Sequence, residues 1–313
     1  MPLINIVVPT FNEEDNVIPI SQAIIDVITN KLPDYDYRII FIDNCSKDKT
    51  RLRLIGLCEN NKKIQAIFNT SNFGQFRSPF YGLQQTTGDC NILMASDFQD
   101  PPELIYDFVK KWEEGYKVVI SVKSKSTENK LIYACRSLYY KVIKKISDVE
   151  QIEHFTGFGL YDKAFIDVIK DLKDPNPYIR GIVSELGFQR AVVEFTQPKR
   201  LHGKSHNNFF ILYDCAMVGI TSYSKTFLRM ATFIGFILAG LCFIAAIIYL
   251  ILKIVFWNSF AAGMAPLLIG VFFIGAIQIF FVGILGEYIL SINTRVMQRP
   301  LVVEEKRINF DNK

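Results

Sequence analysis

The sequence predicts an α/β domain built on a doubly wound, mostly parallel sheet, followed by a C-terminal hairpin of two transmembrane helices. Three observations lead to this fold class. Apolar runs typical of buried strands alternate with helical stretches over the first two-thirds of the chain. Polar clusters follow several of these runs, and two long uncharged apolar runs follow Arg229. Strand and helix in alternation are typical of parallel sheets with helices on both faces.

Five strands are expected from short apolar runs, with helices between them. The strands are Ile4–Pro9, Tyr37–Asp43, Ile64–Asn69, Asn91–Asp97 and Tyr116–Val122. The helices between them are Asn16–Thr29, about Lys49–Asn60, Ser78–Thr86 and Pro102–Glu114. Because the carboxyl ends of parallel strands meet at one edge, the polar clusters after them are expected to form a ligand site. These clusters are Thr10–Glu14, Asp43–Asp48 and Asp97–Asp100.

The residues after the strands exclude two common nucleotide-binding classes. No GxGxxG follows the first strand, and no GxxxxGK[ST] occurs in the chain. A dinucleotide-binding domain and a P-loop NTPase are therefore not expected. Acidic residues at strand ends suit a metal-bound diphosphate instead, because a metal ion can bridge carboxylate and phosphate.

The C-terminal third carries two uncharged runs that are long enough to cross a bilayer. The first is Met230–Leu252, and the second lies between Lys253 and Glu287. Turn-forming residues from Trp257 to Pro266 place a turn at about 254–263. The alternative is a buried pair of helices in a soluble core. Small residues in the hairpin, Gly235, Gly240, Gly270 and Gly275, permit close packing of helices and leave a homo-oligomer possible.

The charges that flank the two spans predict their orientation. Lys225 and Arg229 precede the first span, and four basic residues follow the second, whereas the loop between them has only Lys253. Both termini and the α/β domain are then expected in the cytoplasm of a bacterium, with a multi-pass anchor in the plasma membrane. The expected units are a catalytic domain at 1–206, an amphipathic juxtamembrane segment at 207–226, transmembrane helices at 227–253 and 264–286, and a cytosolic tail at 287–313. The segment 207–226 is either a helix on the membrane surface or an ordinary surface helix.

Composition excludes several other classes. The formal charge of +4 comes without a basic stripe or a base-reading motif, so no nucleic-acid partner is expected. The six cysteines form no CxxC pair, and the three histidines form no metal-binding pattern. Leu3–Val8 is too short for a signal peptide and lacks a basic leader.

Several motifs together resemble glycosyltransferase family 2. They are VVPTFNEEDNV (Val7–Val17), IDNCSKDKT (Ile42–Thr50), NFGQFRSPFYGL (Asn72–Leu83) and SDFQDPPE (Ser96–Glu103). RLHGKS (Arg200–Ser205), GILGEY (Gly283–Tyr288) and the pair Arg299–Pro300 narrow the resemblance. With the hairpin behind them, they resemble polyisoprenyl-phosphate glycosyltransferases, relatives of dolichyl-phosphate mannose synthase. The resemblance implies a GT-A type sheet in the first domain.

The resemblance also implies roles for individual residues. Positions that hold the nucleotide-sugar are Pro9, Phe11, Glu13, Asp43, Ser46 and Asp97. Asp97 and Gln99 match the metal contacts for Mg²⁺ or Mn²⁺, and they alternate along an extended segment, so their oxygens can converge on one ion. Glu13 and Asp43 have an alternative reading as helix caps, and SDFQDPP has one as a loop that starts a helix.

Basic residues after the fifth strand are the candidates for holding an acceptor phosphate. They are Lys123, Lys125, Arg136, Ser137 and Arg200. Arg200 and Ser137 match family positions best, and with Asp97 they are the expected catalytic residues. The alternative for the lysines is solvated surface charge.

The chain departs from the family pattern at three positions. Asn44 replaces the second acid of DDGS, and Ala95 replaces the first acid of the DxD motif. Gly157, in TGFGL, stands where the family has an Asp proposed as the catalytic base. An acceptor phosphate monoester needs no such base, because its second pKa of about 6 makes it mostly a dianion at pH 7.

The function that the resemblance implies is inverting transfer of a sugar from a nucleotide-sugar, a UDP-hexose or UDP-N-acetylhexosamine, to undecaprenyl phosphate. The product would serve the decoration of a cell-surface glycan. Two alternatives stay open at this point. One is a non-catalytic sugar-nucleotide sensor or membrane assembly partner, which Ala95 and Gly157 motivate. The other is a polysaccharide-elongating transferase, which predicts additional spans and a QxxRW-like motif that the sequence lacks.

Overall fold

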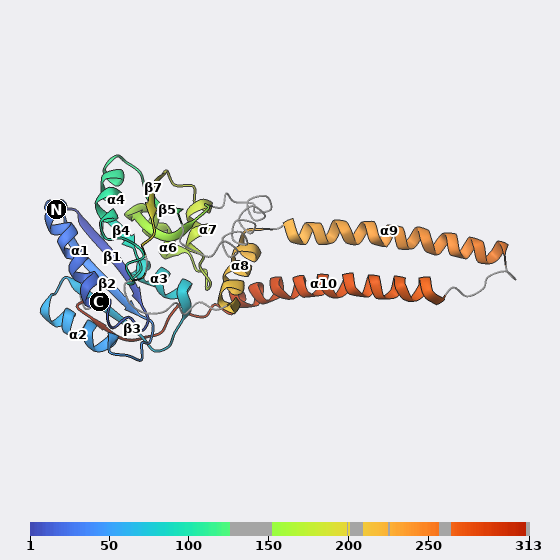
Figure 1. The fold of residues 1–313 in the computed structure, drawn as a ribbon, viewed down its shortest axis with the longest axis horizontal. Helices are drawn as coiled ribbons and strands as arrows, with labels where there is room; N and C mark the ends of the chain where they lie inside the picture. Colours follow the sequence, from blue (N-terminus) through green and yellow to red (C-terminus); the bar gives the residue numbers. More distant parts are fainter. Residues whose placement is uncertain (126–151, 199, 201–208, 225, 257–263, 311–313) are drawn as a thin grey trace.

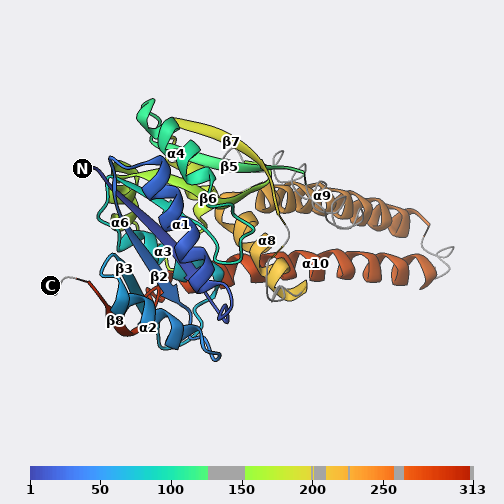
Figure 2. The same cartoon turned by 60° about the vertical axis from the view of Figure 1, so that its left-hand side comes forward.

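The computed structural model contains an α/β domain from which two long helices project together (Figure 1). The structure describes residues 1–313 except 126–151, 199, 201–208, 225, 257–263 and 311–313. Figure 2 shows the same two helices, α9 and α10, leaving the domain in one direction when the view is turned.

One eight-stranded sheet forms the centre of the domain, in the order β7-β5-β6-β4-β1-β2-β3-β8. Its strands are β1 (Leu3–Thr10), β2 (Asp36–Asp43), β3 (Ile64–Asn69), β4 (Cys90–Leu93), β5 (Val118–Lys125), β6 (Phe155–Asp162), β7 (Arg190–Thr196) and β8 (Glu304–Ile308). β1 pairs in parallel with β2 and β4, β2 with β3, and β5 with β7. The five expected strands are all present, although the fourth ends at Leu93 rather than Asp97.

The sheet is mixed, because two of its strands run against the others. β6 lies between β4 and β5 and is antiparallel to both, and β8 is antiparallel to β3. The sequence pattern did not identify β6, β7 or β8. β6 and β8 pair with strands that are distant in sequence. A local pattern of hydrophobic residues does not predict pairing of this kind.

Helices cover both faces of the sheet, as a doubly wound fold requires. The helices α1 (Val17–Lys31), α2 (Thr50–Asn60) and α4 (Leu104–Glu113) bury their apolar residues against one face, with Ile4, Ile6 and Phe41. The helices α3 (Gly74–Gln84), α6 (Lys163–Asp171) and α7 (Ile179–Glu185) cover the other face, with Val7 and Ile40. Alternate residues of one strand thus belong to opposite cores, because successive side chains of a strand point to opposite faces.

The segment expected beside the membrane contains α8 (Phe209–Tyr223), which packs against α10. Tyr213 donates a hydrogen bond to Glu287 of α10 at 2.9 Å, and Tyr288 donates one to the carbonyl of Ser224 at 2.6 Å. Gly181 of α7 lies against Tyr223, and a Cβ atom at this glycine would lie 2.2 Å from the tyrosine ring. The absence of a side chain at Gly181 therefore lets α7 and α8 approach closely.

The two projecting helices are α9 (Thr226–Val255) and α10 (Met264–Val296), and they expose many large apolar side chains. In the described part of the chain, one segment, Phe273–Val296 of α10, is long and apolar enough to cross a membrane. The described apolar stretch of α9 is the shorter Thr232–Leu241. One candidate span is therefore found, and the two-span hairpin stays a prediction.

The last part of the chain corrects the expectation of a separate tail at 287–313. α10 continues past position 286 to Val296, and β8 then joins the edge of the sheet beside β3 (Figure 2). Asn309 donates hydrogen bonds to the carbonyls of Cys58 and Ile64, and Val302 is buried. The chain from Val302 to Asn309 is thus part of the α/β domain, because β8 satisfies backbone groups of β3 that would otherwise form an exposed edge.

Candidate active site

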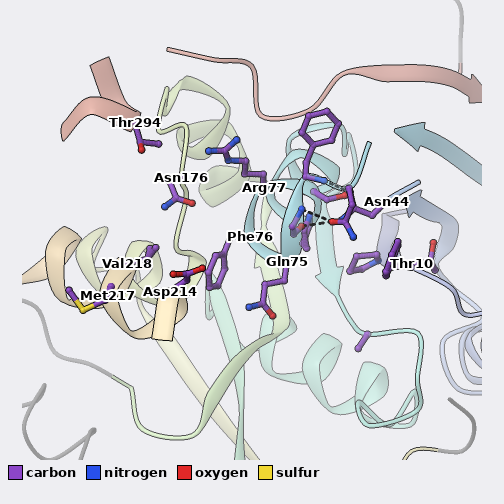
Figure 3. A pocket seen from close by; sticks show the side chains of 18 of the residues that line it. Thr10, Asn44, Gln75, Phe76, Arg77, Asn176, Asp214, Met217, Val218 and Thr294 are labelled. Atoms are coloured by element: carbon purple, nitrogen blue, oxygen red, sulfur yellow. Dashed lines mark hydrogen bonds between the residues drawn. The ribbon is translucent and has the colours of Figure 1, made fainter. Parts of the chain in front are cut away.

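A pocket of about 980 Å³ opens at the carboxyl ends of β1, β2 and β4. The strand ends, the start of α3, the faces of α8 and α10, the loop before α7 and the segment after β7 line it. The lining residues that enter the argument are Pro9, Phe11, Glu13, Asn44, Gln75, Phe76, Arg77, Asp97, Asn176, Arg200, Asp214 and Glu287. Figure 3 shows Thr10 and Asn44 on one side of this pocket and Met217 and Val218 of α8 on the other.

A second pocket of about 260 Å³ adjoins the first and shares Pro9, Phe76, Asp97 and Arg200 with it. Its other polar lining includes Gln99, Asp100, Lys123, Thr156 and Arg180. The hydroxyl of Thr156 is buried without a hydrogen-bond partner among the described residues. The smaller pocket thus has unused hydrogen-bonding capacity and brings several cationic side chains together.

Asp97 lies where the two pockets meet and is paired with Arg200. Its carboxylate is 2.9 Å from the guanidinium of Arg200 and also accepts a hydrogen bond from the backbone N–H of Gln99 at 3.1 Å. Arg200 lies 3.8 Å from the carboxylate of Glu13 as well. One guanidinium therefore balances two carboxylates from different strand ends. Because Asp97 is only 4% exposed, loss of Arg200 would leave a buried carboxylate without this cationic partner.

The donor set at Asp97 is suitable for a divalent cation that also binds phosphate. The carboxylate of Asp97 and the side chain of Gln99 both line the smaller pocket. The described residues contain no group of three or more His, Cys, Asp or Glu side chains that could hold a metal ion by themselves. Mg²⁺ in phosphate sites commonly takes one or two protein carboxylates and completes its shell with phosphate and water, so two protein oxygens fit such an ion.

Asp100 lies beside the two expected metal contacts but makes an internal contact. It is buried, and its carboxylate accepts a hydrogen bond from the backbone N–H of Ala95 at 2.8 Å. Burial raises the pKa of Asp100 to about 6, while the backbone hydrogen bond and Lys123 oppose this rise. Asp100 therefore closes the loop between positions 95 and 100, which contains Asp97.

Asp43 and Ser46, both expected at the nucleotide, do not line either pocket. Asp43 is fully buried, 3.2 Å from the guanidinium of Arg51, and accepts hydrogen bonds from the backbone N–H of Ser46. Burial raises the pKa of Asp43, although Ser46 and Arg51 lower it. The hydroxyl of Ser46 accepts a hydrogen bond from the N–H of Asn12. In this structure both residues hold the loops around the pocket in place.

Asn44, which replaces the second acid of the DDGS motif, lines the main pocket. Its amide nitrogen donates to Asn72 at 2.7 Å, and its amide oxygen accepts from the N–H of Phe73 at 2.9 Å. An aspartate could not donate the first of these hydrogen bonds when ionised. The asparagine therefore fixes the turn before α3 against the end of β2. In the sequence, the only indication of this contact was the motif Asn72–Gly74, which supplies both of these partners.

The residues expected at the acceptor phosphate are only partly placed. Lys123 lines the smaller pocket together with Arg200, whereas Arg136 and Ser137 lie outside the described residues, as does the side chain of Lys125. Arg180 of α7 also lines this pocket and was not identified from the sequence, because no motif surrounds it. The fold thus brings Lys123, Arg180 and Arg200 to one pocket from three separate segments.

Gly157 also lines the smaller pocket and has a backbone conformation that side chains rarely adopt. Its φ is +102°, and a Cβ atom there would lie 3.2 Å from Cγ2 of Ile179. An aspartate at this position would be strained in the present backbone. Glycine at position 157, where the family has an aspartate, therefore fits the backbone conformation and the close approach of Ile179.

Comparisons with known proteins show the family of the chain. The model of glycosyl transferase family 2 matches residues 5–168. A bactoprenol glucosyl transferase of Shigella phage SfX is 34% identical over 305 residues, which are 97% of this chain and 99% of that protein. A prophage bactoprenol glucosyl transferase homolog of Escherichia coli is 33% identical and covers 95% of this chain and 96% of its own length.

A third relative is the uncharacterized glycosyltransferase sll0501 of Synechocystis. It is 31% identical over 299 residues, 95% of this chain and 93% of that protein. The family model and the relatives together cover the α/β domain and almost the whole chain. The chain therefore belongs to glycosyltransferase family 2, with a GT-A-like mixed α/β sheet, and it is a glycosyltransferase.

Proposed function

We propose that the protein transfers a sugar from a nucleotide-sugar, a UDP-hexose or UDP-N-acetylhexosamine, to a polyisoprenyl phosphate such as undecaprenyl phosphate. One observation carries this proposal: the pocket at the strand ends is also walled by α10, the helix that contains the candidate membrane span. A donor site with a wall on this helix is suited to an acceptor that resides in the membrane. Relatives of similar length are named bactoprenol glucosyl transferases, which supports the same class of acceptor.

A groove of about 490 Å³ between α8 and α10 supports a lipid acceptor. Ile279, Phe280 and Ile284 of α10 line it, and it shares Met217 and Glu287 with the main pocket. An apolar groove that adjoins the main pocket suits isoprene units of a polyisoprenyl chain, because their burial removes apolar surface from water.

The donor would lie along the strand ends, with the nucleoside at Pro9, Phe11 and Glu13 and the diphosphate beside Asp97. Asp97 and Gln99 are the residues that would hold Mg²⁺ or Mn²⁺, which when bound neutralises charge on the diphosphate leaving group. Arg200 lies between the two pockets, where its guanidinium can turn from carboxylate to phosphate oxygens with bidentate geometry. Lys123 and Arg180 offer positive charge to the acceptor phosphate in the smaller pocket.

The reaction is then a direct displacement at the anomeric carbon of the sugar. A phosphate oxygen of the lipid forms the new bond to this carbon, and the bond to the nucleoside diphosphate breaks with its electron pair leaving on the diphosphate. The configuration inverts, so an α-linked donor gives a β-linked lipid product. Because the acceptor phosphate is already mostly a dianion at pH 7, no side chain has to remove a proton at Gly157. Positioning by the cationic residues supplies the catalysis.

In this proposal the protein is a multi-pass protein of a bacterial plasma membrane with its catalytic domain and both termini in the cytoplasm. The test is incubation of the full chain in nanodiscs with undecaprenyl phosphate, a panel of UDP-sugars and Mg²⁺ or Mn²⁺. Mass spectrometry of the extracted lipid should detect a lipid-linked sugar with at least one donor and none after chelation of the metal. Binding of a donor without any product across the panel would favour the non-catalytic sensor instead.

A further inference from the structure

The α8 side of the main pocket gathers hydrogen-bonding side chains from three separate elements. Arg77 comes from α3, Asn176 from the loop before α7, and Asp214 from α8. Figure 3 shows these three side chains and the ring of Phe76 around the same space. None of the motifs found in the sequence assigns a function to Arg77, Asn176 or Asp214.

These three polar side chains have hydrogen-bonding capacity that the described residues do not use. In the part of the chain that the structure describes, neither the guanidinium of Arg77 nor the carboxylate of Asp214 makes a hydrogen bond or an ion pair, and the side-chain amide of Asn176 makes none. By contrast, Asp97 and Arg200 of the same pocket neutralise each other at 2.9 Å. Opposite charges that line one pocket without pairing can contact different edges of a ligand.

Phe76 adds an apolar surface at the same place. Its ring makes an edge-to-face contact with Tyr178, with centroids 5.6 Å apart and an interplanar angle of 76°. This contact restrains the ring, and Phe76 lines both pockets. A sugar ring has apolar C–H groups on its faces and hydroxyl groups at its rim, so an aromatic ring beside planar polar groups matches both of its surfaces.

The charges around this space favour a neutral ligand. Arg77 and Asp214 balance each other, and Glu287, which accepts a hydrogen bond from Tyr213, adds a second carboxylate at the α10 side. Lys123 and Arg180, in contrast, line the smaller pocket. A phosphate group or a uronic acid is therefore opposed near Asp214 and favoured in the smaller pocket, whereas hydroxyl groups can donate to the carboxylate and accept from Arg77.

We infer that Arg77, Asn176 and Asp214 form the binding site for the sugar ring of the donor, and that this sugar is an uncharged, hydroxyl-rich hexose or N-acetylhexosamine. The inference rests on the proposed function and adds the residues that select the sugar. Hydrogen bonds to substrate hydroxyls give strong selectivity, because a site built for them is left with unpaired polar groups when the wrong sugar binds.

The test compares binding of the nucleotide with binding of the nucleotide-sugar. Full-length protein in nanodiscs with Mg²⁺ is titrated with UDP and with the UDP-sugar that gives most lipid product in the donor panel. Asp214→Asn and Asn176→Ala should each weaken binding of the UDP-sugar on the order of tenfold, as expected for the loss of one hydrogen bond to a ligand. Their affinity for UDP should stay within about twofold of the unmodified protein, since no nucleoside or phosphate contact changes.

Asp107→Asn is the matched control, because Asp107 is an exposed carboxylate on α4 that lines neither pocket. It should leave both affinities unchanged. Equal weakening of UDP and UDP-sugar by the two site variants would overturn the inference, and so would unchanged binding of both. If the unmodified protein forms no lipid-linked sugar with any donor, the proposed function fails. If transfer is normal but the site variants bind the UDP-sugar as tightly as the unmodified protein, only the assignment of the sugar site fails.

Discussion

The carboxylate of Asp97 lines both pockets, pairs with Arg200 and carries the hydrogen bond from Gln99. Asp97→Asn keeps the size of the side chain and removes its charge, so both the ion pair and the proposed metal contact weaken. We expect kcat/KM for sugar transfer to fall on the order of 100-fold, as for other groups that stabilise charge in a transition state. Transfer rates measured in nanodiscs against the Asp107→Asn control test this expectation. Activity within a few-fold of the unmodified protein would remove Asp97 from the mechanism.

Gly157 allows a prediction about stability rather than activity. Restoring the family residue by Gly157→Asp places a side chain at φ +102° and against Ile179. The expected cost is about 1–3 kcal/mol of unfolding free energy, and Gly157→Ala should show a similar cost because it shares the backbone strain. Denaturant unfolding of the two variants measures it. A gain in kcat for Gly157→Asp would contradict the proposal that the acceptor phosphate needs no base.

At the scale of elements, β8 connects the end of α10 to the donor side of the domain. Glu305 lies 2.7 Å from Arg51, which in turn lies 3.2 Å from Asp43 at the end of β2. Tyr81 of α3 donates a hydrogen bond to Glu304 at 2.9 Å. β8, the strand that follows α10, therefore contacts residues of α2 and α3 on the two faces of the sheet, and it supports the loop that carries Asn44.

Removal of β8 should destabilise the domain. A chain that ends at Pro300 loses the β3–β8 pairing and the hydrogen bonds of Asn309, and it exposes β3 as an edge strand. The melting temperature is expected to fall by at least about 4 °C, which corresponds to a loss of one or two kcal/mol for a domain of this size. A chain that ends at Phe310 keeps β8 and is the control. Equal melting temperatures for the two truncations would show that β8 adds no stability.

At the scale of the whole molecule, the proposed two-span hairpin makes a prediction about which side of a membrane each part of the chain occupies. With two spans, position 259 in the loop between α9 and α10 lies outside the cell and the C-terminus lies inside. A Ser259→Cys substitution should then react with a membrane-impermeant maleimide in intact cells, whereas a cysteine added at the C-terminus should react only after lysis. Failure of position 259 to react in intact cells, or reaction of the C-terminal cysteine before lysis, would contradict the hairpin.

Which strands, helices and site residues could be predicted from the sequence depends on how distant segments come together in the whole molecule. Hydrophobic runs predicted β1 to β5 and most of their helices, because each run reports burial of its own residues. The motif residues Glu13, Asp97 and Arg200 were identified separately, and the structure brings them within ion-pair distance at one pocket. Arg180, Asn176 and Asp214 were not identified, since nothing in their neighbouring residues distinguishes them from ordinary surface side chains. Arg77 lies within the motif Asn72–Leu83, but the motif by itself gave this residue no role.

The sequence by itself determined the family, the alternation of strands and helices, the long apolar runs of the C-terminal third and the loss of an acid at Gly157. These features are local, because periodicity, composition and motifs depend on residues that are close in the chain. Only the tertiary structure decided that the sheet is mixed, that Asp43 is buried against Arg51 instead of lining the pocket, and that the C-terminus returns as β8. Those outcomes depend on pairing between distant segments, and the free energy of such contacts is set by packing, burial and charge in three dimensions.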